Sequence, residues 1–205
     1  MIKKVIFDID YTLLVPNYDD EKEFFKNTSM NDYFLNHIGE LLEEYERTHT
    51  RYEVQELLHY LSQYTSKPLQ EDFLYNWFSF NTKLKEQDVS ESKEILQYCK
   101  QKGLEIVALT NWFTEVQRQK LEKVGLSPYF DEIYGGDVWL KPHRESYLTA
   151  VGSRSFEECV MIGNNLSVDV MAPAQLGMHA IHYTQKDVQH EYEKVKKLTE
   201  IKKYF

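Results

Sequence analysis

The stretch from Lys4 to Ile9 reads KVIFDI, a short run of apolar and β-branched residues that contains one acid. Such a run predicts a strand that is buried on both faces, as strands of a parallel sheet are. Two acids, Asp8 and Asp10, lie at its carboxyl end. Ligands of open α/β sheets bind at that edge, so these two acids are candidates for a functional site.

Strands and helices alternate after Ser90, and this alternation predicts parallel βαβ units. Further strands are expected at 104–109, 130–134, 159–162 and 180–183. Helices are expected at 91–102, 114–125, 142–151 and from 163 to about 176. Thr114 and Gln117 predict a capping box for the second of these helices, and Pro142 is expected in the first turn of the third. A charged amphipathic helix at 187–205 is expected to pack on the outside.

The segment from Pro16 to Gln87 differs from the rest of the chain and predicts several amphipathic helices. Its apolar residues recur at helical spacing, and Gly39 is its one glycine. We therefore expect an α/β core, residues 1–15 and 88–205, that is interrupted by a helical cap, residues 16–87. Aromatic residues are expected to fill the core of the cap, with a pocket lining as the alternative; they include Tyr33, Phe34, Tyr52, Tyr60, Tyr64, Tyr75 and Phe78.

Composition narrows the classes of function. The chain has 24 basic and 33 acidic side chains and a net charge of −9, so nucleic acids and anionic membranes are poor partners. No apolar run is long enough to cross a membrane, and acids interrupt the N-terminal run, so we expect a cytoplasmic protein without a signal peptide. Cys99 and Cys159 form no CxxC pair and are expected to be buried thiols. The oligomeric state stays open.

The spacing of Asp8 and Asp10 has a chemical meaning. Residues i and i+2 of an extended segment point the same way, so both carboxylates can face one ligand. Two carboxylates at one site repel each other unless a cation intervenes, and oxygen-rich ligation favours Mg²⁺. One can then act as a nucleophile and the other as a general acid and base. Lys141 adds a fixed positive charge, and the Thr110 hydroxyl can hold phosphate oxygens.

Four segments, taken in order, resemble the haloacid dehalogenase-like hydrolase superfamily, in the branch whose helical cap follows the first motif. They are DIDYTLL at 8–14, LTN at 109–111, KP at 141–142 and IGNNLSVD at 162–169. The resemblance covers essentially the whole chain. It implies a Rossmann-like three-layer α/β core with a parallel sheet, and an inserted α-helical cap.

The resemblance also implies roles for individual residues. Asp8 would attack phosphorus and form an aspartyl-phosphate, and Asp10 would protonate the leaving alcohol and then accept a proton from water. The phosphoryl group would be bound by Thr110, Asn111 and Lys141. The Mg²⁺ ion would be held by Asp8, the backbone carbonyl of Asp10, Asn164 and Asp169.

Three positions depart from the pattern of the superfamily. Asn164 stands where an aspartate usually follows the glycine of the fourth motif. Its carbonyl oxygen can bind Mg²⁺, but the site loses one negative charge, so we expect weaker metal binding. Tyr11 stands where many relatives have a small residue, and its ring is expected at the entrance of the site or against the cap. Val138 stands where relatives often have glycine.

The expected function is Mg²⁺-dependent hydrolysis of a small phosphate monoester, with a nucleotide, a sugar phosphate or phosphoglycolate as the substrate. A true dehalogenase is one alternative, but its chemistry needs neither a metal nor Asp10. A phosphoryl transferase or sugar-phosphate mutase would use the same four motifs. A non-catalytic binding protein with a weakened metal site is the third alternative, and Asn164 is its one support.

Overall fold

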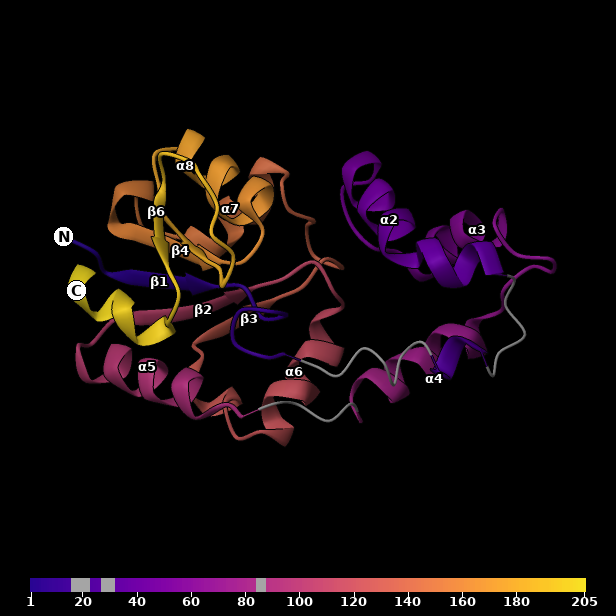
Figure 1. Ribbon diagram of the computed structural model, residues 1–205, viewed down its shortest axis with the longest axis horizontal. Coiled ribbons are helices and arrows are strands. Elements are labelled where there is room, and N and C mark those ends of the chain that lie inside the picture. The colour runs from indigo at the N-terminus through magenta and orange to yellow at the C-terminus, as the bar shows by residue number, and fades with distance from the viewer. Residues whose placement is uncertain (16–22, 27–31, 84–87) are drawn as a thin grey trace.

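The computed structural model describes residues 1–15, 23–26, 32–83 and 88–205. In this part of the chain six parallel strands form one sheet in the order β3-β2-β1-β4-β5-β6 (Figure 1). The strands are β1 Lys4–Phe7, β2 Glu105–Leu109, β3 Glu132–Tyr134, β4 Cys159–Gly163, β5 His179–Tyr183 and β6 Glu193–Val195. The strand order reverses between β1 and β4, and such a point is where open α/β sheets bind ligands.

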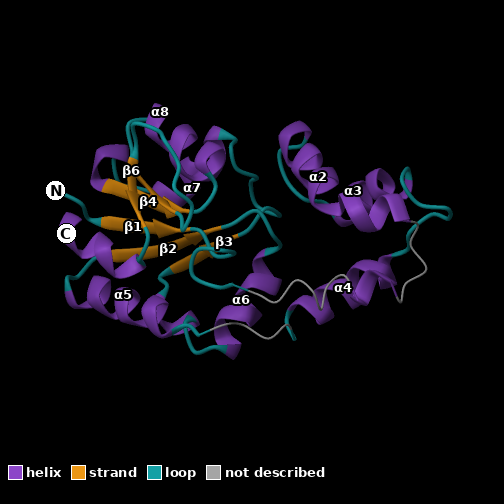
Figure 2. Ribbon diagram, viewed as in Figure 1, coloured by secondary structure: helices purple, strands orange, loops and turns teal. Residues whose placement is uncertain are grey.

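Helices flank the sheet in one half of the molecule, and the other half is built from helices without a strand among its described residues (Figure 2). The sheet half contains α5 Ser90–Gln101, α6 Thr114–Lys123, α7 Arg144–Val151 and α8 Ala172–Gln175. Its shorter helical segments are η1 Ser127–Tyr129, η2 Phe156–Glu158, η3 Leu166–Met171 and η4 Leu198–Tyr204. The other half contains α2 Asp32–Thr48, α3 Val54–Ser62 and α4 Glu71–Asn81. No helix of the described residues combines the length and the apolar character needed to cross a membrane.

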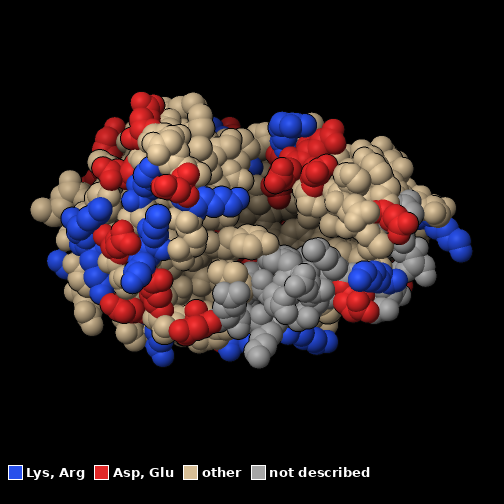
Figure 3. All heavy atoms as spheres, in the orientation of Figure 1, with Lys and Arg blue, Asp and Glu red and all other residues tan. Residues whose placement is uncertain are grey.

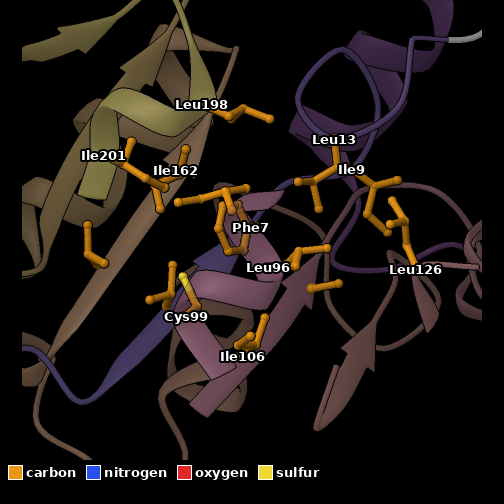
Figure 4. Packing of buried hydrophobic residues seen from close by; sticks show 14 of the residues in the cluster. Phe7, Ile9, Leu13, Leu96, Cys99, Ile106, Leu126, Ile162, Leu198 and Ile201 are labelled. Atoms are coloured by element: carbon orange, nitrogen blue, oxygen red, sulfur yellow. The ribbon is translucent and has the colours of Figure 1, made fainter. Parts of the chain in front are cut away.

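The two faces of β1 pack against different helices, because successive side chains of a strand point to opposite faces. Phe7 packs with Leu96 and Cys99 of α5 and with Ile201 of η4 (Figure 4). Ile6 belongs to a second cluster, together with residues of α7. The sheet therefore lies between two helical layers, which confirms the predicted three-layer α/β core. Cys99 and Cys159 are buried free thiols, as predicted.

The register of the strands brings the candidate residues to one edge of the sheet. Phe7 lies opposite Ala108 of β2 and Ile162 of β4. The chain segments that follow the strands β1, β2 and β4 therefore leave the sheet side by side. They begin with Asp8 after β1, Thr110 after β2 and Asn164 after β4.

The helices α2, α3 and α4 share one hydrophobic cluster with three residues of the sheet half, namely Phe113, Val116 and Leu140. Backbone hydrogen bonds join the same two halves. The amide of Tyr52 donates to the carbonyl of Gly136 at 2.7 Å, and the amide of Leu140 donates to the carbonyl of Thr50 at 2.8 Å. The segment that the sequence predicts as a cap is thus attached to the loop between β3 and α7. Both predicted boundaries of that cap, residues 16 and 87, lie outside the described residues.

The aromatic residues of the segment divide into buried and exposed ones. Phe34 and Tyr52 belong to the hydrophobic cluster, as predicted. Tyr33 and Tyr75 are 52% and 56% exposed, so for these two residues the prediction of a core position is wrong. Both occupy faces of α2 and α4 that point away from the cluster, because a helix buries only the stripe that meets its neighbours.

The C-terminal segment differs from the predicted external helix at 187–205. It forms the edge strand β6 and the short helix η4 instead. Val195, Leu198 and Ile201 are buried in the main core. Their spacing of three residues fits one face of a helix, which explains the wrong prediction. In the structure β6 instead satisfies the backbone groups at the exposed edge of β5.

Three further local predictions need correction. Thr114 does not cap α6 with Gln117: its hydroxyl and its amide both bond to Asp137 Oδ1 at 2.7 Å. Pro142 precedes α7, which begins at Arg144, and the Lys141–Pro142 peptide bond is cis. The expected continuous helix after β4 is the π-helical turn η3 followed by the short α8. Pro173 lies at the start of α8, where its missing N–H removes a donor from the helical ladder.

Candidate active site

Three charged side chains meet at the carboxyl end of β1 and β4. Lys141 Nζ lies 2.8 Å from Asp8 Oδ1 and 2.6 Å from Asp169 Oδ1. All three residues are buried, with 6% or less of their surface exposed. Gly163 makes room for this arrangement, because a Cβ atom there would lie 2.4 Å from the Asp169 side chain. A buried ammonium group between two buried carboxylates compensates for the loss of their hydration.

The electrostatics of this cluster favour a permanently charged lysine. The pKa of Asp8 is raised to about 7, chiefly because burial disfavours the carboxylate; the Lys141 charge opposes this rise and the Asp169 charge adds to it. Burial by itself would lower the pKa of Lys141, but the attraction of Asp169 and Asp8 outweighs this effect and keeps it above its ordinary value. Lys141 therefore stays protonated and presents a fixed positive charge beside Asp8.

Asp10 is held by two side chains of α6. Its Oδ1 forms an ion pair with Lys120, and its Oδ2 accepts a hydrogen bond from Gln117 Nε2 at 2.5 Å. Lys120 is only 2% exposed, which is unusual for a lysine unless it is paired. Gln117 Nε2 also donates to Thr110 Oγ1 at 3.0 Å. Through Gln117, the helix α6 thus links the Asp10 carboxylate to the Thr110 hydroxyl.

Asn111 connects the loop that carries Lys141 to the cap helix α2. Its Oδ1 accepts from the amide of Lys141 at 2.7 Å, and its Nδ2 donates to the carbonyl of Lys141 at 3.0 Å. The same Nδ2 donates to Glu46 Oε2 at 2.8 Å. Glu46 Oε1 in turn accepts from the Tyr52 hydroxyl at 2.7 Å. In this structure the Asn111 side chain positions the Lys141 loop, and its predicted contact with phosphate stays a prediction.

The Asn164 amide meets two oxygen atoms, Asp8 Oδ2 and the Asp10 carbonyl oxygen, where the sequence predicts the metal. With its amide turned one way, Asn164 donates to the Asp10 carbonyl oxygen at 3.0 Å and to Asp8 Oδ2 at 3.3 Å. Turned the other way, the amide places Oδ1 at that point, 3.4 Å from Thr12 Oγ1. An Asp8 carboxylate oxygen, a backbone carbonyl and an amide oxygen then meet. This is the set of oxygen donors that Mg²⁺ prefers, so these residues fit the ion.

Asp169 stands beside this point with both carboxylate oxygens engaged. Oδ1 accepts from Lys141, and Oδ2 accepts from the amide of Asn165 at 2.9 Å. Each carboxylate oxygen can accept more than one bond, so these contacts leave lone pairs on Asp169. Its predicted role as a metal ligand stays a prediction.

A cavity of about 590 Å³ lies between the sheet half and the cap half. It brings together all of the residues that the sequence singles out, namely Asp8, Asp10, Thr110, Asn111, Lys141, Asn164 and Asp169. Tyr11 also lines it and is 47% exposed, in line with the prediction for its ring. Its φ angle of 60° is unusual for a residue with a side chain and turns the chain sharply after Asp10. Figure 3 shows a hollow between the two halves.

The structure adds residues that the sequence reasoning missed. Lys120 and Gln117 hold Asp10, and Glu46 holds Asn111. Nothing in the spacing of the segment GELLEEYE, residues 39–46, separates Glu46 from the other glutamates. Their role depends on tertiary structure and not on a local sequence pattern, because these side chains reach the site only when α2 and α6 pack over the end of the sheet.

Two characterised proteins share part of this sequence. The chain is 30% identical over 98 residues to the ribulose-1,5-bisphosphate 5-phosphatase of Halopiger xanaduensis, which covers 45% of this chain and 41% of that protein. It is 24% identical over 116 residues to a pyrimidine 5′-nucleotidase of Streptococcus pneumoniae, which covers 54% of this chain and 49% of that protein. The chain therefore spans less than half of the length of either relative.

The fold has close structural counterparts. A phosphatase of the haloacid dehalogenase type from Thermococcus onnurineus superposes with a TM-score of 0.67 at 22% identity, over 99% of this chain and 97% of that chain. This likeness establishes a common fold. The pattern of the haloacid dehalogenase-like hydrolases matches residues 2–177, which include all four motifs. The chain therefore belongs to the family of haloacid dehalogenase-like hydrolases.

Proposed function

We propose that this protein is a Mg²⁺-dependent phosphatase that hydrolyses a small phosphate monoester through an aspartyl-phosphate at Asp8. The observation that carries the proposal is the buried Asp8–Lys141–Asp169 cluster, with Asp10 lining the same cavity. The names of the relatives, a sugar-bisphosphate phosphatase and a pyrimidine nucleotidase, support a small phosphorylated metabolite as the substrate.

In the first step, an Asp8 oxygen forms a bond to phosphorus while the bond from phosphorus to the leaving-group oxygen breaks. Asp10 enters this step protonated and gives its proton to that oxygen, so the leaving group departs as a neutral alcohol and Asp10 is left as the carboxylate that pairs with Lys120. Gln117 and Lys120 orient the Asp10 carboxyl group for this transfer. Lys141 neutralises part of the charge on the phosphoryl group, and the Thr110 hydroxyl donates to one of its oxygens.

In the second step, Asp10 accepts a proton from a water molecule, whose oxygen attacks phosphorus. The bond between phosphorus and Asp8 breaks, inorganic phosphate is released and the Asp8 carboxylate is restored. A Mg²⁺ ion held by Asp8, the Asp10 carbonyl, Asn164 and Asp169 would screen the charge of the phosphate so that the Asp8 anion can approach it.

A panel of phosphate esters tests the proposal. Purified protein with Mg²⁺ should release inorganic phosphate from at least one nucleotide, sugar phosphate or small aryl phosphate. Asp8→Asn should lower kcat by about a thousandfold or more, because an amide is no nucleophile towards phosphorus. Substantial turnover by clean Asp8→Asn protein would refute the scheme. Transfer of phosphate to an acceptor alcohol without release of free phosphate would favour a phosphoryl transferase.

A further inference from the structure

We propose that the leaving group of the substrate is an uncharged, ring-bearing alcohol of the nucleoside type, which presents N–H or O–H donors to two glutamates of α2. Substrates with a second anionic group on the leaving group are correspondingly disfavoured. This inference rests on the proposed phosphatase function and concerns the half of the cavity that faces the cap.

The cavity extends beyond what a phosphate group fills. Its volume of about 590 Å³ lies within the range of sites that enclose whole small organic molecules. Asp8, Thr110 and Lys141 mark the end of the cavity at the sheet, where the phosphoryl group would sit. The leaving group would then extend towards residues of the cap, which line the remaining wall.

Acidic side chains form part of that wall. Glu43 and Glu46 lie one turn apart on α2, and both line the cavity. Figure 3 shows acidic side chains gathered over α2 beside the hollow. Glu46 accepts one hydrogen bond on each oxygen, from Tyr52 and Asn111, and each oxygen can accept another. The wall therefore offers hydrogen-bond acceptors, and a leaving group with N–H or O–H donors satisfies them.

The same carboxylates repel an anionic leaving group. Among the described residues that line the cavity, Lys141 is the one with a cationic side chain. It lies at the sheet end, where Asp8 and Asp169 already pair with it. A second phosphate or a carboxylate near α2 would therefore face two like charges and no described counter-charge. Burial raises the pKa of Glu46 above its ordinary value, which indicates how poorly this wall solvates negative charge.

Aromatic rings form another part of the cap wall. The rings of Phe25, Trp77 and Trp112 follow one another with centroid distances of 5.0 and 4.9 Å, and all three line the cavity. Tyr11 adds a fourth, half-exposed ring. The planes of neighbouring rings are inclined by 72° and 59°, and Phe25 and Trp77 are each only 2% exposed. The accessible rings are therefore those of Trp112 and Tyr11, against which a planar ring can pack by burying apolar area and by stacking. Together with the acidic side chains they match a planar base that carries N–H groups.

A charge reversal on α2 tests the inference directly. We would compare kcat/KM for cytidine 5′-monophosphate with kcat/KM for 2-phosphoglycolate. The unmodified protein should favour the nucleotide at least about tenfold. Glu43→Lys should lower that ratio by at least about tenfold, because the new ammonium group attracts the carboxylate of phosphoglycolate. Glu44→Lys is the matched control: Glu44 is exposed on the same helix and does not line the cavity, so the ratio should stay within about twofold.

Binding without turnover gives a second readout. Cytidine 5′-monophosphate should quench the tryptophan fluorescence of the Asp8→Asn protein. Trp112→Phe should reduce that quenching, with Trp77 as the remaining reporter in the cavity wall, whereas Trp139→Phe should leave the cavity signal in place, because Trp139 does not line the cavity.

The outcomes separate this inference from the proposed function. If Glu43→Lys changed the ratio of the two kcat/KM values no more than Glu44→Lys does, the inference would be overturned. A preference of the unmodified protein for phosphoglycolate or for a sugar bisphosphate would also overturn the inference. With either of these outcomes, the observed hydrolysis would still support the proposed phosphatase function. Failure to hydrolyse any ester, para-nitrophenyl phosphate included, would overturn both.

Discussion

Asn164 has an amide group where the usual aspartate of the family has a carboxylate, so an NH₂ group replaces one oxygen and the negative charge is lost. This difference bears on the affinity for the metal. Its amide meets Asp8 Oδ2 and the Asp10 carbonyl oxygen. An amide can turn Nδ2 towards these acceptors and cross-link them without an ion. For the proposed Mg²⁺ ion to bind Oδ1 of Asn164, that hydrogen-bonded arrangement would have to be given up, so we expect weaker binding than an aspartate would provide.

The Asn164→Asp protein should therefore bind Mg²⁺ at least about tenfold more tightly than the unmodified protein, which corresponds to about 1.4 kcal/mol of binding free energy. The substitution removes the competing donor and adds a negative charge among the converging oxygens. Titration calorimetry with MgCl₂ measures the affinity, and the rise of Tm with Mg²⁺ concentration gives an independent value.

Asn165→Asp is the matched control. The Asn165 side chain accepts from the amides of Ser167 and Val168 at the start of η3, and an aspartate keeps both bonds. It adds the same charge one residue away but outside the convergence point. An equal gain in affinity from both variants would contradict a specific role for position 164 and indicate a general effect of charge.

The site residues differ in how far the sequence could predict them. Asp8, Thr110 and Asn164 follow buried strands, and parallel strands place their carboxyl ends along one edge. Their proximity could thus be inferred from order alone. Lys120 and Glu46 lie in the interior of helices. Which face of such a helix meets the site depends on packing against distant residues, so no local pattern revealed them.

At the level of the elements, the C-terminal segment shows where a pattern is ambiguous. Val195, Leu198 and Ile201 repeat every third residue, which suits a helix. The sheet, however, offers β5 a free edge, and the backbone pairing of β6 with β5 outweighs the local preference. The strands β1, β2 and β4 were predicted to within one or two residues, because buried β-branched runs allow few alternatives.

Ile201→Ala tests whether this segment is part of the core. The side chain of Ile201 is fully buried in the same cluster as Phe7 and Cys99. Truncation should cost about 3 kcal/mol of unfolding free energy, because it removes buried apolar surface and leaves a cavity. Urea denaturation followed by circular dichroism measures the loss.

Lys203→Ala in the same short helix provides the comparison. Lys203 is exposed, so its truncation should change the unfolding free energy by no more than about 0.5 kcal/mol. Equal, small effects of the two substitutions would show that the tail lies outside the cooperative core.

For the whole molecule, Gly136 is a tightly packed point of the junction between the two halves. A Cβ atom at this position would lie 2.4 Å from the carbonyl oxygen of Asn111 and 2.8 Å from the Tyr52 ring. It would also lie 2.7 Å from the Leu140 side chain. Three parts of the chain thus approach the backbone of residue 136: Tyr52 of the cap, Asn111 of the second motif and Leu140 of the loop that carries Lys141. Only glycine fits there without displacing these neighbours.

Gly136→Ala should destabilise the protein by at least about 2 kcal/mol, because neighbouring backbone and rings must move to admit the methyl group. It should also lower kcat, since Asn111 holds the backbone of Lys141. Equilibrium urea unfolding and steady-state kinetics measure the two effects.

Gly39→Ala is the opposite case and serves as the control for stability. Gly39 lies within α2, and a Cβ atom there would meet nothing within 4 Å. Alanine should stabilise the helix by about 0.5–1 kcal/mol. If both alanine variants shifted stability in the same direction, the crowding at Gly136 would not be the cause.

The backbone hydrogen bonds between residues 50–52 and 136–140 limit which segments of this enzyme can be exchanged with those of a relative. A chimera that received a foreign cap in place of residues 16–87 would lose the partners of the Gly136 carbonyl and the Leu140 amide. It would also strip Phe113, Val116 and Leu140 of their apolar neighbours. Recombination in this scaffold therefore has to carry the β3–α7 loop, which includes Lys141, along with the segment that contains α2, α3 and α4.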